Sequence, residues 1–122
     1  MSDRPRVLIV EDEWLIAEDT ASRLRAAGYQ VVGPVSSVAA ALRLVEADTV
    51  DVALLDIQLN GETSLPIAET LLARGTPFAF VTGFGQRDLP APFRDCSVVP
   101  KPASEAAILA TVADLALLCA AK

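Results

Sequence analysis

Five short apolar runs, separated by segments of helical periodicity, are the feature that most constrains how this sequence folds. Runs of this kind, rich in β-branched and other apolar side chains, are typical of strands buried on both faces of a sheet. They cover residues 7–10, 30–35, 52–55, 78–81 and 97–99. Because strands alternate with helices, we expect a parallel sheet that is covered by helices on both sides.

The segments between the runs predict the helices and their ends. Apolar residues recur at helical spacing over about residues 14–27, 37–47 and 65–73, and from residue 104 onward. We expect Ser36 or Ser37 to cap the second of these helices and Ser104 to cap the last. Gly28 and Gly75 are expected to end the first and the third helix.

A fourth helix is expected to be short or irregular. The segment of residues 83–96 contains Gly85, Pro90 and Pro92, which disfavour a regular helix. The whole pattern predicts an α/β chain of the flavodoxin-like (βα)5 type, with a doubly wound parallel sheet and strand order 2-1-3-4-5. A length of 122 residues suits one domain, so residues 1–122 are assigned to a single domain.

The helix patterns also predict which side chains face inward. In the last helix the expected inward stripe consists of Ile108, Leu109, Val112, Leu115 and Leu118. We expect Trp14 to be a partly buried packing residue, with contact to a partner as the alternative. The last helix is alanine-rich and carries few charges, so a docking or dimer surface on it is a second possibility beside a purely structural role.

Composition excludes several classes of function. There are 10 Lys and Arg against 16 Asp and Glu, giving a net charge of −6, so we expect neither nucleic acid nor an anionic membrane as a partner. The chain has no histidine, which removes histidine-based acid–base catalysis and most zinc sites. The N-terminus does not resemble a signal peptide and no apolar run is long enough to span a membrane, so a cytoplasmic location is expected.

Polar side chains follow four of the five expected strands. Glu11 and Asp12 follow the first strand and Asp56 follows the third, and these two strands are neighbours in the expected order. The three carboxylates should therefore converge and repel one another unless a cation lies between them. Oxygen ligands without histidine favour Mg²⁺. Thr82 and Lys101 follow the fourth and fifth strands, and a carboxylate, Mg²⁺, a hydroxyl and an ammonium together suit acceptance of a phosphoryl group.

The spaced set of Glu11-Asp12, Asp56, Thr82-Gly83 and Lys101-Pro102 resembles the receiver domain of two-component response regulators, the CheY-like family. The resemblance covers essentially the whole chain. It implies that Asp56 is the phospho-accepting residue, that Thr82 hydrogen-bonds a phosphoryl oxygen and that Lys101 pairs with the phosphate. It also implies a cis peptide bond between Lys101 and Pro102.

The same resemblance implies a Mg²⁺ cofactor and its ligands. Asp12 is expected to bind Mg²⁺ directly, Glu11 directly or through water, and Gln58 through its backbone carbonyl, next to Asp56. The expected phosphodonor is a histidine kinase or a histidine phosphotransfer protein. Like other receivers, the domain would catalyse only its own phosphorylation and dephosphorylation, so it is not expected to be an enzyme.

A narrower resemblance lies in the segment of residues 77–83, which is similar to the PFxFATG motif of single-domain regulators in bacterial general stress signalling. Val81 stands where that motif has alanine. Val98 stands where most receivers carry the aromatic residue that couples to the threonine, so we expect the switch to work through Thr82 and the Gly83–Gly85 loop. Phe84 in this loop is expected to restrict the water that removes the phosphate.

Two alternatives to a phosphorylated receiver stay open. A pseudo-receiver would signal without phosphorylation; the intact site argues against it, but the absent switch aromatic leaves it open. A small Mg²⁺-dependent phosphohydrolase would carry a second aspartate two residues after the nucleophile, and here that position is Gln58. Since no output domain follows in this sequence, the expected output is binding to another protein or phosphate buffering, by a monomer or weak dimer.

Overall fold

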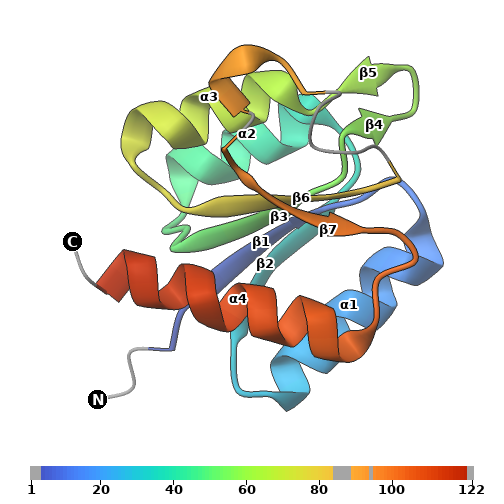
Figure 1. The fold of residues 1–122 in the computed structure, drawn as a ribbon, viewed down its shortest axis with the longest axis vertical. Helices are drawn as coiled ribbons and strands as arrows, with labels where there is room; N and C mark the ends of the chain where they lie inside the picture. Colours follow the sequence, from blue (N-terminus) through green and yellow to red (C-terminus); the bar gives the residue numbers. More distant parts are fainter. Residues whose placement is uncertain (1–3, 84–88, 94, 121–122) are drawn as a thin grey trace.

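In the computed structural model, which describes residues 4–83, 89–93 and 95–120, five parallel strands form one sheet (Figure 1). They are β1 (Arg6–Val10), β2 (Gln30–Val35), β3 (Val52–Leu55), β6 (Phe78–Thr82) and β7 (Ser97–Pro100). Their order across the sheet is β2-β1-β3-β6-β7. Counted along the chain, this is the expected order 2-1-3-4-5, so the flavodoxin-like prediction is confirmed.

Helices cover both faces of the sheet, as Figure 1 shows. The helices α1 (Trp14–Ala26) and α4 (Glu105–Ala120) lie on one face, and α2 (Val38–Ala47) and α3 (Leu65–Arg74) lie on the other. Ser37 caps α2 by accepting a hydrogen bond from the Ala40 N–H, and Ser104 Oγ accepts one from the Ala107 N–H at the start of α4. Gly75 ends α3 with φ +73°, a conformation that glycine adopts without steric cost.

The expected irregular fourth helix is seen in part. A 3₁₀ turn of three residues, Ala91–Phe93, is the helical structure found in the described portion of the segment between β6 and β7. The prolines at positions 90 and 92 account for the short turn, because proline removes backbone donors. Residues 84–88, which include Phe84 and Gly85 of the expected switch loop, lie outside the described residues.

Alternating side chains of the central strands divide the core into two layers. Leu8, Leu55 and Phe80 pack beneath α2 and α3, whereas Ile9 and Leu54 pack beneath α1 and α4. All of these side chains are at least 97% buried. A sheet that is apolar on both faces leaves the ends of the strands as the place for polar chemistry.

A small β-hairpin follows β3. Its strands are β4 (Gln58–Leu59) and β5 (Glu62–Thr63), which pair antiparallel. The turn between them is Asn60-Gly61, with φ +37° and φ +84°. Positive φ at both central residues is typical of the type I′ hairpin turn that Asn-Gly favours.

Two predictions of burial were wrong. Trp14 is 70% exposed, because the buried stripe of α1 is Ala17, Ala21 and Leu24 and the first turn projects beyond it. Leu118 is 58% exposed. After Leu115, the next residue of α4 that faces the core is Cys119, four positions on, so Leu118 points away from it.

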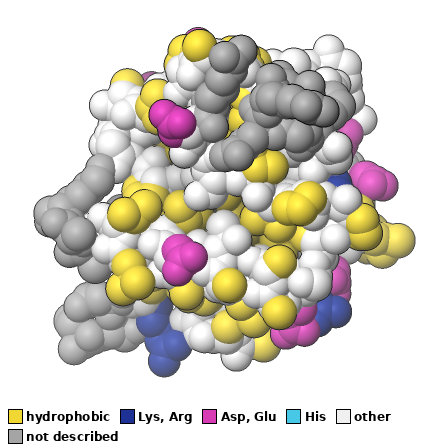
Figure 2. Space-filling view, in the orientation of Figure 1, with side chains coloured by type: hydrophobic (Ala, Val, Ile, Leu, Met, Phe, Trp, Pro, Cys, Tyr) yellow, Lys and Arg dark blue, Asp and Glu magenta, His cyan; other side chains and the backbone are white. Residues whose placement is uncertain are grey.

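The outer face of α4 is apolar. In Figure 2, which keeps the orientation of Figure 1, hydrophobic side chains are spread over the region of α4 and few charged ones lie among them. Leu117 is 71% exposed there. Whether this face docks a partner stays a prediction. Among the described residues, no helix has both the length and the apolar character needed to cross a bilayer.

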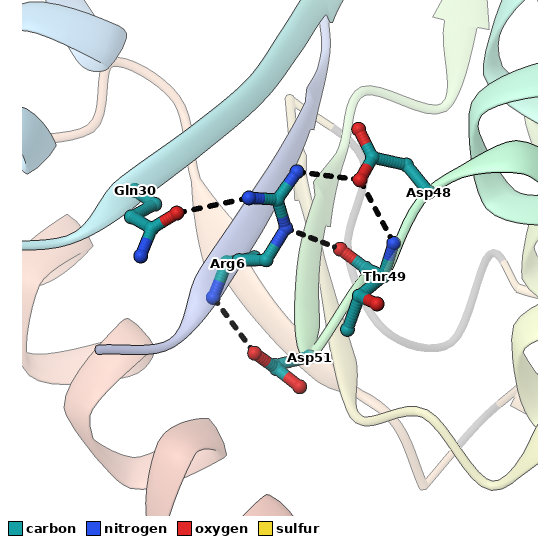
Figure 3. A network of polar contacts seen from close by, with 5 residues as sticks. All are labelled: Arg6, Gln30, Asp48, Thr49 and Asp51. Atoms are coloured by element: carbon teal, nitrogen blue, oxygen red, sulfur yellow. Dashed lines mark hydrogen bonds and ion pairs between the residues drawn. The ribbon is translucent and has the colours of Figure 1, made fainter. Parts of the chain in front are cut away.

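Arg6 ties together the amino ends of the strands, opposite the edge where polar residues follow them (Figure 3). Its guanidinium donates hydrogen bonds to Asp48 Oδ1, to the Thr49 carbonyl at 2.8 Å and to Gln30 Oε1 at 2.9 Å. Its backbone N–H donates to Asp51 Oδ2 at 2.9 Å. One side chain therefore joins β1 to β2 and to the segment that leads into β3.

We predict that Arg6→Ala lowers the free energy of unfolding by about 1–2 kcal/mol, because a partly exposed, multiply bonded guanidinium contributes this order. Urea denaturation measures the change. Arg43→Ala, which removes an exposed arginine of α2, is the matched control and should shift stability by less than about 0.5 kcal/mol. Equal shifts in the two variants would show that the Arg6 network does not stabilise the fold.

Candidate functional site

Three carboxylates meet at the carboxyl edge of the sheet. Glu11 and Asp12 follow β1, and Asp56 follows β3, its neighbour in the sheet. The Asp56 N–H donates to the Val10 carbonyl at 2.9 Å, which extends the strand pairing up to the site. One carboxylate oxygen from each of the three residues lies within 4.8 Å of one from each of the others. The sheet order thus brings together the acidic residues that the sequence predicted to converge.

Lys101 supplies the positive charge of this cluster. Its Nζ lies 2.9 Å from Asp56 Oδ2, to which it donates a hydrogen bond, and 3.3 Å from Glu11 Oε1. The Lys101 N–H also donates to the Thr82 carbonyl at 2.9 Å, which holds the ends of β6 and β7 together. The peptide bond between Lys101 and Pro102 is cis, as expected.

Burial and like charge shift the ionisation of the cluster. Burial raises the pKa of Glu11 to about 7, and the charge of Asp56 adds to this, while the Glu13 N–H and Lys101 oppose it. Burial alone would lower the pKa of Lys101, but the hydrogen bond and charge of Asp56, followed by Glu11, raise it above its ordinary value. The single positive charge of Lys101 therefore does not fully offset the negative charge of this acidic cluster, in which two carboxyl groups are buried and a third lies beside them.

The donor set fits a hard divalent cation. Three carboxylates without histidine are the ligands that Mg²⁺ prefers. Glu11 and Asp56 are buried, whereas Asp12 is half-buried and so reaches both the cluster and solvent. Asp12, Glu11 and Asp56 are thus the residues that would hold the ion.

Thr82 and Gln58 occupy different surroundings. Thr82 ends β6, is 3% exposed and lies in the sheet between the strands that lead to Asp56 and Lys101. Gln58 lies two residues after Asp56 in β4, with an exposed side chain. Its role as a carbonyl ligand of the metal stays a prediction.

The hairpin contributes a contact that sequence reasoning missed. The Asn60 N–H donates to Asp12 Oδ2 at 3.1 Å, and the Glu13 N–H donates to Glu11 Oε2 at 3.1 Å. Both acidic side chains are therefore oriented by backbone amides. The Asn60-Gly61 pair predicts the hairpin turn itself but not this contact, which joins residues 48 positions apart.

Comparison with known proteins agrees with this geometry. The sequence profile of the response regulator receiver domain matches residues 7–113. The chain belongs to this family. Receiver domains act in two-component signalling, where they bind Mg²⁺ at an acidic pocket and accept phosphoryl groups from histidine kinases or phosphotransfer proteins.

Individual relatives are similar over most of the receiver domain. The transcriptional regulatory protein PdtaR of Mycobacterium tuberculosis is 35% identical over 95 residues, which are 77% of this chain but 46% of PdtaR. This chain therefore spans less than half the length of that relative. SdrG from Sphingomonas melonis Fr1 is 41% identical with a TM-score of 0.80, over 94% of this chain and 98% of SdrG.

Two further solved structures resemble the receiver domain. The BeF3-activated conformation of SdrG gives a TM-score of 0.78 at 41% identity, over 95% of this chain and 99% of that one. The response regulator PhyR from Brucella abortus gives a TM-score of 0.83 at 30% identity, over 97% of this chain and 50% of PhyR. The fold of this chain is therefore shared over nearly the whole SdrG chain and over half of the PhyR chain.

The raised pKa of Glu11 predicts how the stability of the metal-free receiver depends on pH. Between about pH 4.5 and 7 the folded state binds more protons at Glu11 than the unfolded state, so this group's stabilising contribution is lost as pH rises through about 7. Glu11→Gln should flatten that dependence and raise the free energy of unfolding at pH 8 by about 1–3 kcal/mol in the presence of a chelator.

Urea denaturation at several pH values measures this effect. Glu18→Gln, at an exposed position of α1, is the matched control and should leave the pH dependence unchanged. Mg²⁺ should stabilise the wild-type protein more than Glu11→Gln. Parallel pH profiles for wild type and Glu11→Gln would show that Glu11 titrates normally in the fold.

Proposed function

We propose that this receiver accepts a phosphoryl group on Asp56 from a histidine kinase or histidine phosphotransfer protein in the presence of Mg²⁺. The observation that carries the proposal is the contact of the Lys101 ammonium with Asp56 at 2.9 Å, beside the carboxylates of Glu11 and Asp12. Asp56 is thus paired with the ammonium of Lys101 and flanked by carboxylates that could bind Mg²⁺. Phosphoryl transfer to an aspartate needs both of these positive charges.

In the proposed step, an Asp56 carboxylate oxygen attacks the phosphorus of the donor. The new O–P bond forms as the P–N bond of a phosphohistidine, or the P–O bond of an acyl phosphate, breaks with its electron pair leaving on the donor. Lys101 exchanges its contact with Asp56 for one with a phosphoryl oxygen, and the Thr82 hydroxyl donates to another. Thr82 ends β6 and Lys101 directly follows β7, its neighbour in the sheet, which supports these roles.

Mg²⁺, when bound, neutralises charge shared between the phosphoryl oxygens and the carboxylates. Asp12, Glu11 and Asp56 would hold it, with the Gln58 carbonyl as a further ligand. The Asn60 N–H keeps Asp12 turned toward the cluster.

The proposed output is a change in protein–protein binding, switched through Thr82 and the loop up to Gly85. Val98, half-buried against the core, replaces the aromatic partner of other receivers. The 41% identity to SdrG and the PFxFATG-like segment of residues 77–83 favour a place in general stress signalling. Cytoplasmic location and a monomeric or weakly dimeric state are parts of the same proposal.

We predict that acetyl phosphate with Mg²⁺ adds one phosphoryl group to the wild-type protein and none to Asp56→Asn, as measured by intact-mass spectrometry. Asp51→Asn, which changes an aspartate at the opposite end of β3, is the matched control and should still be modified. Chelation of Mg²⁺ should abolish the adduct. Lys101→Ala should reduce its yield at least about tenfold, because the ammonium offsets developing phosphoryl charge.

Two outcomes would replace the proposal. If neither acetyl phosphate nor a phosphorylated histidine phosphotransfer protein adds a phosphoryl group to the protein, a pseudo-receiver would be favoured. Continuous phosphate release from many donors, without a lasting adduct, would favour a small phosphohydrolase.

Exposed apolar side chains beside the site suit docking of the protein phosphodonor. Trp14, Leu15 and Ile16 open α1, directly after the acidic pair, and are 70%, 72% and 42% exposed. Such a patch next to a reactive centre is favourable for contact with a partner. The partner contact that the sequence left open for Trp14 is therefore the interpretation that we propose.

We predict that Trp14→Ala slows phosphotransfer from a phosphorylated histidine phosphotransfer protein about tenfold or more, because a large aromatic anchor of this kind contributes about 1.4 kcal/mol or more. Labelling by acetyl phosphate should be unchanged, since that donor needs no docking surface. Leu72→Ala, at an exposed position of α3, is the control. If Trp14→Ala slows phosphorylation equally with both donors, the substitution perturbs the phosphorylation site and not the docking of the partner.

A further inference from the structure

A pocket opens beside the acidic cluster, between α1 and α4. It has a volume of about 370 Å³. Its floor is formed by Ile9, Leu54 and Val81 of the sheet together with Ile108 of α4. These four side chains are all at least 91% buried, so the floor is part of the core.

The pocket exists because small side chains stand where the two helices face each other. Thr20 of α1 and Ala103, just before α4, line its walls and leave the space between the helices unfilled. The larger Leu15 and Ile16 stand at its rim and are exposed instead of filling it. A pocket of this size is in the range that takes small organic molecules, about 300–1,000 Å³.

Charge is distributed unevenly around the pocket. Glu11, Asp56 and Lys101 line one end, and Asp19 lines the side toward solvent. Asp19 also pairs with Arg23 of the next helical turn.

Arg23 extends this charge network across to the second helix. It forms a further ion pair with Glu105 at the start of α4, so it joins the two walls of the pocket. Among the described residues, the pocket lining itself carries three carboxylates, Glu11, Asp19 and Asp56, against the one ammonium of Lys101. An apolar floor with an excess of negative charge complements a ligand that is apolar at one end and positively charged at the other.

We propose that this pocket binds a small amphipathic cation, such as an aryl- or alkylammonium compound. The apolar part lies on Ile9, Leu54 and Ile108, and the ammonium lies toward the carboxylates of Glu11 and Asp56. The site depends on the shape and charge of the folded chain and does not require that Asp56 accepts a phosphoryl group.

A direct test uses 4-phenylbutylamine, with 4-phenylbutanol and 5-phenylpentanoate as neutral and anionic probes of similar size. Binding to the Mg²⁺-free protein is measured from amide chemical shifts in NMR spectra. The amine should shift the amides of Thr20, Ala103 and Ile108 and should bind at least about tenfold more tightly than the alcohol or the carboxylate. Because Mg²⁺ occupies the same carboxylates, adding it should raise the dissociation constant of the amine.

Matched variants locate the binding. Thr20→Leu fills the pocket and should weaken binding of the amine at least about tenfold, whereas Ser22→Leu, the same kind of change at an exposed position of α1, should not. Asp19→Asn removes one negative charge without changing the size of the side chain. It should reduce the ratio by which the protein binds the amine more tightly than the alcohol. This second variant tests the charge argument even where Thr20→Leu perturbs folding.

Three results would overturn the proposal. Equal affinity for the amine and the alcohol would show that charge does not select the ligand. Preference for the carboxylate would show that Lys101 determines the charge of the bound group. Shifts that map away from Thr20 and Ala103, or that Mg²⁺ leaves unchanged, would place the ammonium elsewhere.

Discussion

The contact of Lys101 with Asp56 and Glu11 is the interaction on which the rest of the site depends. Two buried carboxylates and a third beside them repel one another, and among the described residues the cation in contact with them is Lys101. The parallel sheet creates this problem, because it directs the ends of β1, β3, β6 and β7 to one edge. The same concentration of charge is what makes the edge suitable for a metal ion and a phosphoryl group.

Much of the fold and of the site follows from the sequence for a simple physical reason. Strands buried on both faces read as continuous apolar runs, so the polar residue after each run marks the strand end. That reasoning brought Glu11, Asp12, Asp56 and Lys101 to one edge, and the structure has them there. The assignment of roles to Thr82 and Gln58 came from the family resemblance and stays a proposal.

What the sequence did not predict depends on contacts between distant segments. The hydrogen bond from Asn60 to Asp12 joins residues 48 positions apart, and no local pattern encodes it. Trp14 was expected to pack because it is large and apolar, yet the stripe of α1 that faces the sheet is set by Ala17, Ala21 and Leu24. Periodicity identifies a buried face but not where the covered surface ends.

The start of α1 thus combines three properties at one place: clustered carboxylates before it, exposed apolar side chains on it and a pocket beside it. The most direct test of the central claim is a crystal structure with Mg²⁺ and beryllofluoride, which mimics a phosphoryl group. The account predicts beryllium bonded to Asp56, Mg²⁺ held by Asp12 and its neighbours, and Lys101 moved from Asp56 to a fluoride. Lys101 still on an unmodified Asp56, with Mg²⁺ bound elsewhere, would contradict it.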